Sequence, residues 1–124
     1  LIVIDSCVWI EALQGSPTGQ RYLSLWDKPD NILVSTCVQY EIKRWCERFL
    51  DEEVAAQAVS VTRQCVIVPI TEKIALLAAE FGRDYRLAAL DAMIYATTIA
   101  HGATLVSCDA HFAKLEHVDY KPKS

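Results

Sequence analysis

Four acidic residues that lie far apart in the sequence are the strongest candidates for chemistry: Asp5, Glu41, Asp91 and Asp109. Carboxylates that lie close together repel one another, and some of them stay protonated at neutral pH unless a cation neutralises the group. Mg²⁺ and Mn²⁺ prefer oxygen ligands of this kind. A bound ion can activate a water molecule and stabilise the charge that develops on a phosphate under attack. If the fold brings these residues together, the sequence predicts a Mg²⁺ or Mn²⁺ site suited to phosphodiester hydrolysis.

Short β-branched apolar runs are the main structural signal. They occur at residues 1–4, 32–35, 66–68 and 103–107, with a shorter run at 118–120, and segments of helical period lie between them. Strands that alternate with helices form a parallel sheet with both faces covered. We therefore expect a single α/β domain over residues 1–124: a three-layer α/β/α sandwich with a parallel sheet of four to five strands.

This topology predicts where the acidic residues lie. Asp5 follows the first strand directly, and Asp109 comes two residues after Ser107, at the end of the last long strand. Glu41 lies near the start of the helix after the second strand, and Asp91 opens a nearly all-apolar helix. All four are expected at the carboxyl edge of the sheet, where open parallel sheets form their sites. They converge if the first and last long strands are neighbours.

Two serines and three arginines are candidate supporting residues. Ser6 and Ser107 adjoin the acidic residues and could orient a water molecule or a ligand carboxylate. Arg44 and Arg48 lie on the same flank of their predicted helix as the second acidic residue, and these two and Arg86 are candidates for holding phosphates. Charged helix faces are usually only solvated, so the arginines also have a purely structural interpretation.

Each acidic residue has a structural alternative as well. Asp5, Asp91 and Asp109 could cap helices or occupy their first turns. Glu41 could be a first-turn acid favoured by the helix dipole, or a partner of Arg44 at i+3. The functional interpretation rests on the occurrence of all four at one sheet edge.

Histidine and aromatic residues are interpreted mainly as structural. His111 could act as a general base or ligand, but a lone histidine beside a cleft is more often solvent-facing. Trp9 and Trp26 are assigned to the core, although Trp26 could also anchor a partner. The helix that holds Glu41 has an amphipathic apolar stripe, typical of one face packed on a core: Val38, Ile42, Trp45, Cys46 and Phe49.

Composition limits the class of protein. The formal net charge is −4, whereas nucleic-acid binders are usually basic, so acidic residues must be concentrated where a cation neutralises them. Five cysteines without a CxxC motif are expected to be reduced thiols in a cytoplasmic protein. The apolar opening run is too short to span a membrane, and no membrane partner is expected.

Three segments resemble the PIN-domain nucleases. LIVIDSCVWIE resembles their opening strand with its first acid, VQYEIKR their second-acid helix, and LAALDAMIYATTIAHGATLVSCDAHF their third-acid helix, strand and fourth acid. The resemblance covers essentially the whole chain. The order and spacing are most similar to the small VapC-type toxins of prokaryotic toxin–antitoxin pairs.

The resemblance implies a five-stranded parallel sheet, Mg²⁺ or Mn²⁺, hydrolysis of RNA, a homodimer and a cognate antitoxin that blocks the acidic cleft. By position, Asp5, Glu41, Asp91 and Asp109 match the family's acids, and Ser107 matches its frequent Ser or Thr. Cys108 is a departure, since many members carry a basic or polar residue there. The expected function is therefore a metal-dependent endoribonuclease, the toxin of such a pair.

Three other functions stay open. One is a non-catalytic PIN-like module that binds protein, and another is a nuclease of the same fold that acts in RNA processing or on DNA. A flavodoxin-like receiver or phosphatase domain is disfavoured, because Cys7 stands where a DxD phosphatase needs its second Asp and no Lys closely follows the last long strand.

Overall fold

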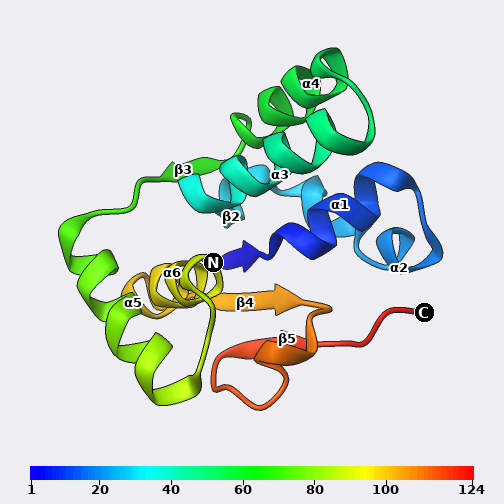
Figure 1. The fold of residues 1–124 in the computed structure, drawn as a ribbon. Coiled ribbons are helices and arrows are strands. Elements are labelled where there is room, and N and C mark those ends of the chain that lie inside the picture. Colours follow the sequence, from blue (N-terminus) through cyan, green and yellow to red (C-terminus); the bar gives the residue numbers. More distant parts are fainter.

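A five-stranded sheet forms the centre of the computed structural model, which describes all of residues 1–124 (Figure 1). The strands are β1 (Ile2–Ile4), β2 (Ile32–Ser35), β3 (Val66–Val68), β4 (Thr104–Ser107) and β5 (Val118–Tyr120). All pair in parallel, in the order β3-β2-β1-β4-β5. The predicted strands are confirmed, including the short fifth one.

Helices cover both faces of the sheet. They are α1 (Ser6–Gln14), α2 (Pro17–Gln20), α3 (Thr36–Phe49), α4 (Glu52–Thr62), α5 (Glu72–Tyr85) and α6 (Ala89–Ala100), with 3₁₀ segments η1 (Leu23–Asp27), η2 (Pro29–Asn31) and η3 (Ala110–Phe112). Crossovers between parallel strands are right-handed. Because the chain reverses its direction across the sheet after β3, α1 to α4 lie on one face and α5 and α6 on the other (Figure 1). The three-layer α/β/α prediction is confirmed.

The two strands that carry the first and last acidic residues are neighbours. Ile2 of β1 pairs with Thr104 of β4, and Ile4 pairs with Val106. The pairing continues one residue further, since the backbone N–H of Asp5 donates to the carbonyl of Val106 at 2.9 Å. The geometric condition for convergence at the carboxyl edge is therefore met.

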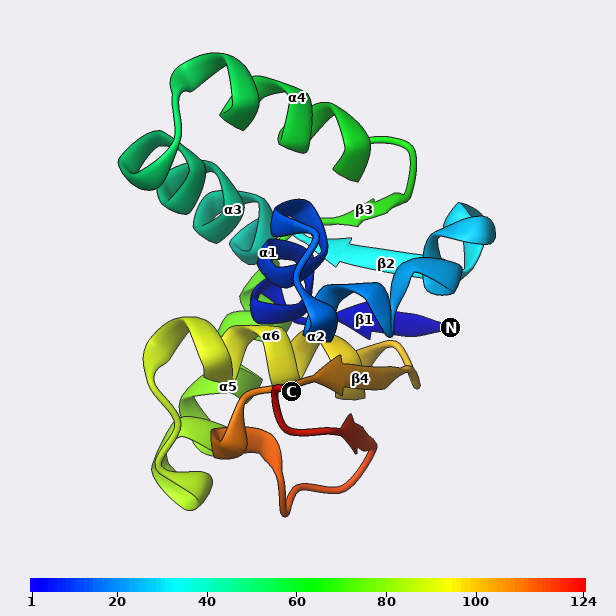
Figure 2. The same cartoon turned by 90° about the vertical axis from the view of Figure 1, so that its right-hand side faces the viewer.

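Helix α3 departs from the predicted packing. Val38, Ile42 and Cys46 are buried, but Phe49 at the end of the predicted stripe is 56% exposed. Figure 2 shows the reason: α3 continues outward beyond the carboxyl ends of the strands, and α4 makes the return to β3. The expectation of a fully core-facing stripe was wrong for its last turn, which forms a wall beside the carboxyl edge instead.

The remaining core follows the sequence pattern. Trp9 is buried, and Trp26 of η1 packs against it edge to face with ring centroids 4.9 Å apart. In α6, Thr97 and Thr98 are buried. Their hydroxyls are satisfied there because they donate to the carbonyls of Met93 and Ile94 one turn earlier. No helix has the length and apolarity needed to cross a membrane.

Candidate active site

Asp5 lies at the junction of β1 and α1, which it caps. Its Oδ1 accepts a hydrogen bond from the Ser6 N–H at 2.8 Å, and its Oδ2 accepts from Ser107 Oγ at 2.8 Å and Cys7 Sγ at 3.2 Å. Such donors stabilise the ionised carboxylate. The side chain is nevertheless so deeply buried, at 2% exposure, that burial outweighs these bonds and raises the pKa of Asp5. The capping interpretation is correct, but Asp5 also accepts hydrogen bonds from Ser107 and Cys7, which lie outside the cap interaction.

Glu41 lies in the second turn of α3. The first-turn alternative is wrong, since the first turn of α3 has no acidic residue, and Glu41 forms no ion pair with Arg44. Instead its Oε1 accepts a hydrogen bond from Ser6 Oγ at 3.0 Å. Burial, followed by the charges of the other three acidic residues, raises the pKa of Glu41 to about 7.

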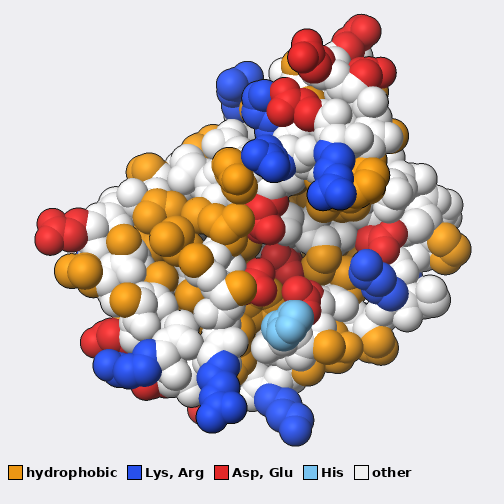
Figure 3. Space-filling view, viewed as in Figure 1, with side chains coloured by type: hydrophobic (Ala, Val, Ile, Leu, Met, Phe, Trp, Pro, Cys, Tyr) orange, Lys and Arg blue, Asp and Glu red, His pale blue; other side chains and the backbone are white.

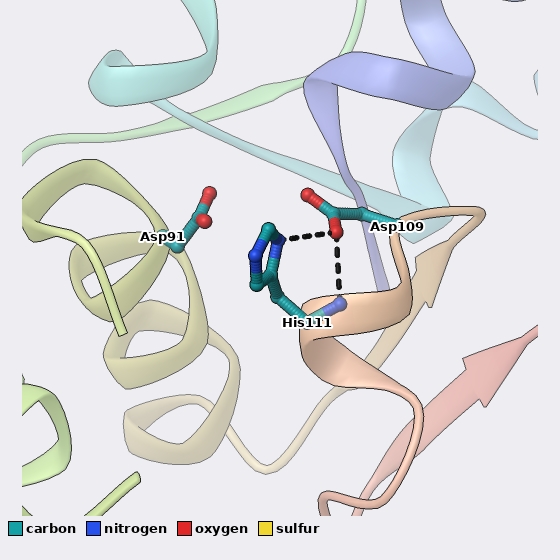
Figure 4. A group of neighbouring side chains, drawn as sticks. All are labelled: Asp91, Asp109 and His111. Carbon is teal, nitrogen blue, oxygen red and sulfur yellow. Dashed lines mark hydrogen bonds and ion pairs between the residues drawn. The ribbon is translucent and has the colours of Figure 1, made fainter. Parts of the chain in front are cut away.

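Asp91 occupies the first turn of α6. Ala88 is the N-cap of that helix, so the first-turn alternative is correct and the N-cap alternative is wrong. Burial, and then the charges of Asp5 and Asp109, raise the pKa of Asp91 to about 6. The carboxylate projects from α6 toward η3 (Figure 4).

Asp109 caps η3 and contacts His111. Its Oδ1 accepts a hydrogen bond from the His111 N–H at 2.9 Å, and the ring Nδ1 of His111 lies 2.7 Å from the same oxygen (Figure 4). One ligand atom from each of Asp91, Asp109 and His111 lies within 4.8 Å of the others. His111 is solvent-exposed as predicted, and it also borders the acidic residues.

A continuous series of hydrogen bonds links three of the acidic residues through two serines. The Ser6 hydroxyl donates to Glu41 while its backbone N–H donates to Asp5. Ser107 Oγ donates to Asp5 and accepts from the Asp109 N–H at 2.9 Å. Both serines therefore orient carboxylates, and the linked residues lie in α1, α3 and β4 and at the N-caps of α1 and η3.

The acidic cluster, defined as Asp5, Glu41, Asp91 and Asp109, has no Lys or Arg partner. Ion pairs of Lys and Arg side chains lie elsewhere, at Lys43–Glu47, Arg83–Asp84 and Lys123–Glu11. The mutual repulsion within the cluster is one cause of the raised pKa values of Glu41 and Asp91. Carboxylate oxygens without a Lys or Arg partner fit a hard divalent cation such as Mg²⁺ or Mn²⁺, and the imidazole of His111, which contacts Asp109, lies beside them.

Comparison with known protein families shows which family the chain belongs to. The PIN domain family matches residues 2–118 of the chain. The chain belongs to the PIN domain family. Comparison with curated protein sequences gives no significant match.

Solved toxin structures share the fold of this PIN domain. A toxin–antitoxin complex from Klebsiella pneumoniae superposes with a TM-score of 0.80 at 22% identity, covering 96% of each chain. VapC20 of Mycobacterium tuberculosis, a toxin that cleaves the Sarcin-Ricin loop, gives 0.80 at 18% identity over 94% of this chain and 95% of its own. VapBC2 of Rickettsia felis, bound to promoter DNA, gives 0.76 at 16% identity over 99% and 98%. At these identities the likeness concerns the fold.

Two cysteines lie beside the acidic cluster of this PIN domain, and only Cys108 was singled out from the sequence. Cys7 Sγ donates to Asp5, and Cys108 Sγ lies 3.1 Å from Cys7 Sγ. Burial and the charge of Asp5 raise the pKa of Cys7, so it remains a thiol that can donate. Cys108, the departure from the family pattern, is buried and faces Cys7. A signal was present: Cys7 lies in the first turn of the helix that Asp5 caps.

The arginines divide into two groups. Arg44 and Arg48 line a hollow of about 260 Å³ that also includes Ser6 and Glu41, so it opens onto the acidic cluster. Arg86 lies outside this hollow; it ends α5 in the left-handed conformation, with φ of 55°. The structure therefore brings Arg44 and Arg48, but not Arg86, to the border of the acidic cluster through a shared hollow.

Proposed function

We propose that this PIN domain is a metal-dependent endoribonuclease, and that it is the toxin of a VapBC-type toxin–antitoxin pair. The supporting observation is the acidic cluster: four acidic residues from separate parts of the chain lie at one sheet edge, near enough for their charges to raise the pKa values of Glu41 and Asp91, and none pairs with Lys or Arg. Such an arrangement costs stability in the absence of a cation. Binding of Mg²⁺ or Mn²⁺ removes that cost.

Each residue has a distinct role in this proposal. Asp5, Glu41, Asp91 and Asp109 would hold the ion, and a bound ion would act as a Lewis acid and lower the pKa of a bound water. Ser6 and Ser107 fix the carboxylates of Glu41 and Asp5 through their hydroxyls, so the ligands are oriented before an ion arrives.

The phosphate backbone of the substrate needs positive charge close to the acidic cluster. Arg44 and Arg48 border the cluster and are suited to hold the phosphates that flank the cleaved bond. Arg86 follows α5, and any contact it makes with RNA lies outside the hollow. The cluster holds four of the sixteen Asp and Glu residues, as many negative charges as the formal net charge of −4, and a bound cation would neutralise part of them.

The shared fold supports the proposed partners. The similar structures include a toxin–antitoxin complex, VapBC2 bound to promoter DNA, and a toxin that cleaves the Sarcin-Ricin loop. The antitoxin complexes among these structures support a cognate antitoxin as inhibitor, and we propose in addition, from the sequence resemblance, that the protein acts in the cytoplasm as a homodimer. A structured RNA is the appropriate first substrate to test.

The decisive experiment is cleavage of a labelled structured RNA by the purified protein with Mg²⁺, with Mn²⁺ and with EDTA. The Asp91→Asn variant, prepared in parallel, controls for contaminating nuclease. We expect metal-dependent cutting that the variant lacks. A folded wild-type protein that neither cuts RNA nor binds metal would instead favour a non-catalytic protein-binding module, and cutting of DNA alone would refute the ribonuclease assignment.

A further inference from the structure

The hollow beside the acidic cluster has a second chemical character that the metal site does not use. We call it the α3 hollow, because six of its nine lining residues come from α3: Tyr40, Glu41, Arg44, Trp45, Arg48 and Phe49. The other three are Ser6, Ile10 and Leu90. Residues four apart lie above one another on a helix. The six therefore form two rows, one of Glu41, Trp45 and Phe49 and one of Tyr40, Arg44 and Arg48.

The first row passes from a carboxylate to two aromatic rings. The ring centroids of Trp45 and Phe49 are 5.3 Å apart, with an angle of 42° between their planes. Phe49 is 56% exposed and Tyr40, in the second row, is 52% exposed. Large apolar side chains usually lose such exposure on folding. Phe49 remains in water because the last turn of α3 projects beyond the sheet (Figure 2).

The second row supplies positive charge that nothing in the chain neutralises. The one ion pair on α3 joins Lys43 to Glu47, and neither Arg44 nor Arg48 pairs with a carboxylate. The guanidinium of Arg48 lies over the Phe49 ring at 5.1 Å from its centroid. Figure 3 shows Lys and Arg side chains beside the acidic side chains near the centre of this face. Two cationic groups therefore lie beside two aromatic rings on one helix face.

Positively charged grooves with exposed aromatic rings bind unpaired nucleic-acid strands, because every base can stack on a ring while phosphates meet the cations. Glu41 and Ser6 belong both to the α3 hollow and to the hydrogen-bonded acidic site. Four residues of helix rise about 6 Å, a length comparable with one nucleotide step in an extended strand. A strand with a phosphate at the acidic cluster can therefore run along α3.

We propose that the α3 hollow is a nucleotide subsite that takes an unpaired base of RNA next to the cleaved phosphodiester. The base stacks on Trp45 and Phe49, and Arg44 and Arg48 hold the adjoining phosphates. This inference rests on the proposed function for the class of substrate. It adds which side chains hold the base and the adjoining phosphates, and a base inside a duplex reaches the rings only after it has left its stack.

Binding measurements in the Asp91→Asn background separate this proposal from catalysis. The probe is a fluorescein-labelled single-stranded RNA, compared by anisotropy with the same sequence in a duplex. We expect Phe49→Ala and Phe49→Leu to weaken binding of the single strand by about tenfold, and Phe49→Tyr to restore it. Because Phe49 is exposed at the end of α3, melting temperatures should not change. Leu76→Ala, which truncates an apolar residue 62% exposed on α5, is the matched control.

Salt dependence distinguishes the two rows. Arg48→Gln should reduce the slope of log K against log salt concentration by about 0.7, the value for one lost phosphate contact on a single strand. Phe49→Leu should leave that slope unchanged, and Arg63→Gln, at the exposed residue that follows α4, should change neither slope nor affinity.

Three results would overturn the subsite: single-strand affinity of Phe49→Leu within about twofold of the control, equal losses for duplex and single strand, or variants that change only self-association or binding of a protein partner. If wild-type protein cuts RNA while Phe49→Leu binds normally, the nuclease stands and the subsite fails. If no RNA is cut but the predicted losses appear, the subsite stands and the nuclease fails.

Discussion

Ser107 Oγ lies 2.8 Å from Oδ2 of Asp5 and donates a hydrogen bond to it, across the pairing of β1 and β4. The same oxygen accepts the backbone N–H of Asp109 at 2.9 Å. One buried hydroxyl therefore fixes both the carboxylate that follows the first strand and the turn that carries the last acidic residue. Asp5 and Ser107 are about a hundred residues apart in the sequence, and the pairing of β1 with β4 brings them together.

Removal of this hydroxyl should be costly. In Ser107→Ala the Asp109 N–H loses its acceptor and Asp5 loses a donor, so we expect the free energy of unfolding to fall by about 1–3 kcal/mol. The pKa of Asp5 should rise further, because the lost bond favours the ionised form. Urea denaturation at constant m-value measures the loss. Ser60→Ala, at an exposed position of α4, is the control, and equal stability of the two variants would refute this role.

Stability of the metal-free protein should fall as pH rises from about 4.5 to about 7. The folded-state pKa of Glu41 is raised from 4.5 to about 7, and that of Asp91 from 3.8 to about 6. The folded state therefore binds more protons than the unfolded state in this window, and the derivative of the unfolding free energy with pH is negative. The two groups oppose folding least below the window and most above it.

Thermal melts across this pH range in EDTA test the effect. Glu41→Gln should flatten the difference between acid and neutral pH, because the amide has no charge to bury. A divalent ion should restore stability near pH 8 and have little effect near pH 4.5, where protons compete for the carboxylates. A wild-type protein and a Glu41→Gln variant with parallel pH profiles would contradict the prediction.

Metal binding should stabilise the fold through Asp5. A ligand that binds only the native state adds about 2.7 kcal/mol at a concentration of 100 Kd, so Mn²⁺ should raise the melting temperature of the wild-type protein by several degrees. Asp5→Asn retains the size and an acceptor oxygen but loses the charge, and its metal shift should be much smaller. Asp119→Asn, at an exposed position of β5, should shift like wild type. Equal shifts in wild type and Asp5→Asn would remove Asp5 from the proposed ligands.

The fold was predictable where local pattern determines it. The branched runs around Val34 and Val106 became buried parallel strands, and Asp5 and Asp109 lie at strand ends because that placement follows from topology alone. The adjacency of β1 and β4 remained a condition rather than a conclusion, because no local signal states which parallel strands are neighbours.

Side-chain contacts were less accessible to sequence reasoning. The direction of α3 depends on the return path through α4, so the exposure of Phe49 could not be deduced from an apolar stripe. The contact of His111 with Asp109 depends on a short 3₁₀ turn, whose boundaries have no strong sequence signal. Cys7 was expected only to be a reduced thiol, whereas its contact with Asp5 arises from the cap geometry.

Gly19 should be essential for the packing of α2 on α1, the helix that carries Ser6. A Cβ at this position would lie 2.2 Å from the carbonyl oxygen of Glu11 and 2.6 Å from the nitrogen of Ala12. Both are backbone atoms of α1 and cannot move aside as a flexible side chain could. Gly19→Ala should therefore lower the free energy of unfolding by about 1–3 kcal/mol, or more.

The same substitution at Gly82, inside α5, should instead raise the free energy of unfolding. A Cβ there meets the Leu87 carbonyl oxygen at 3.5 Å and Ala92 Cβ at 3.8 Å, which are ordinary contacts. Replacing glycine by alanine in a helix interior adds about 0.5–1 kcal/mol, so Gly82→Ala should unfold at a higher urea concentration than wild type. Melting curves of the two variants side by side test the pair. If Gly19→Ala were as stable as Gly82→Ala, the close approach of α2 to α1 would be refuted, and with it the support that α2 gives to the helix carrying Ser6.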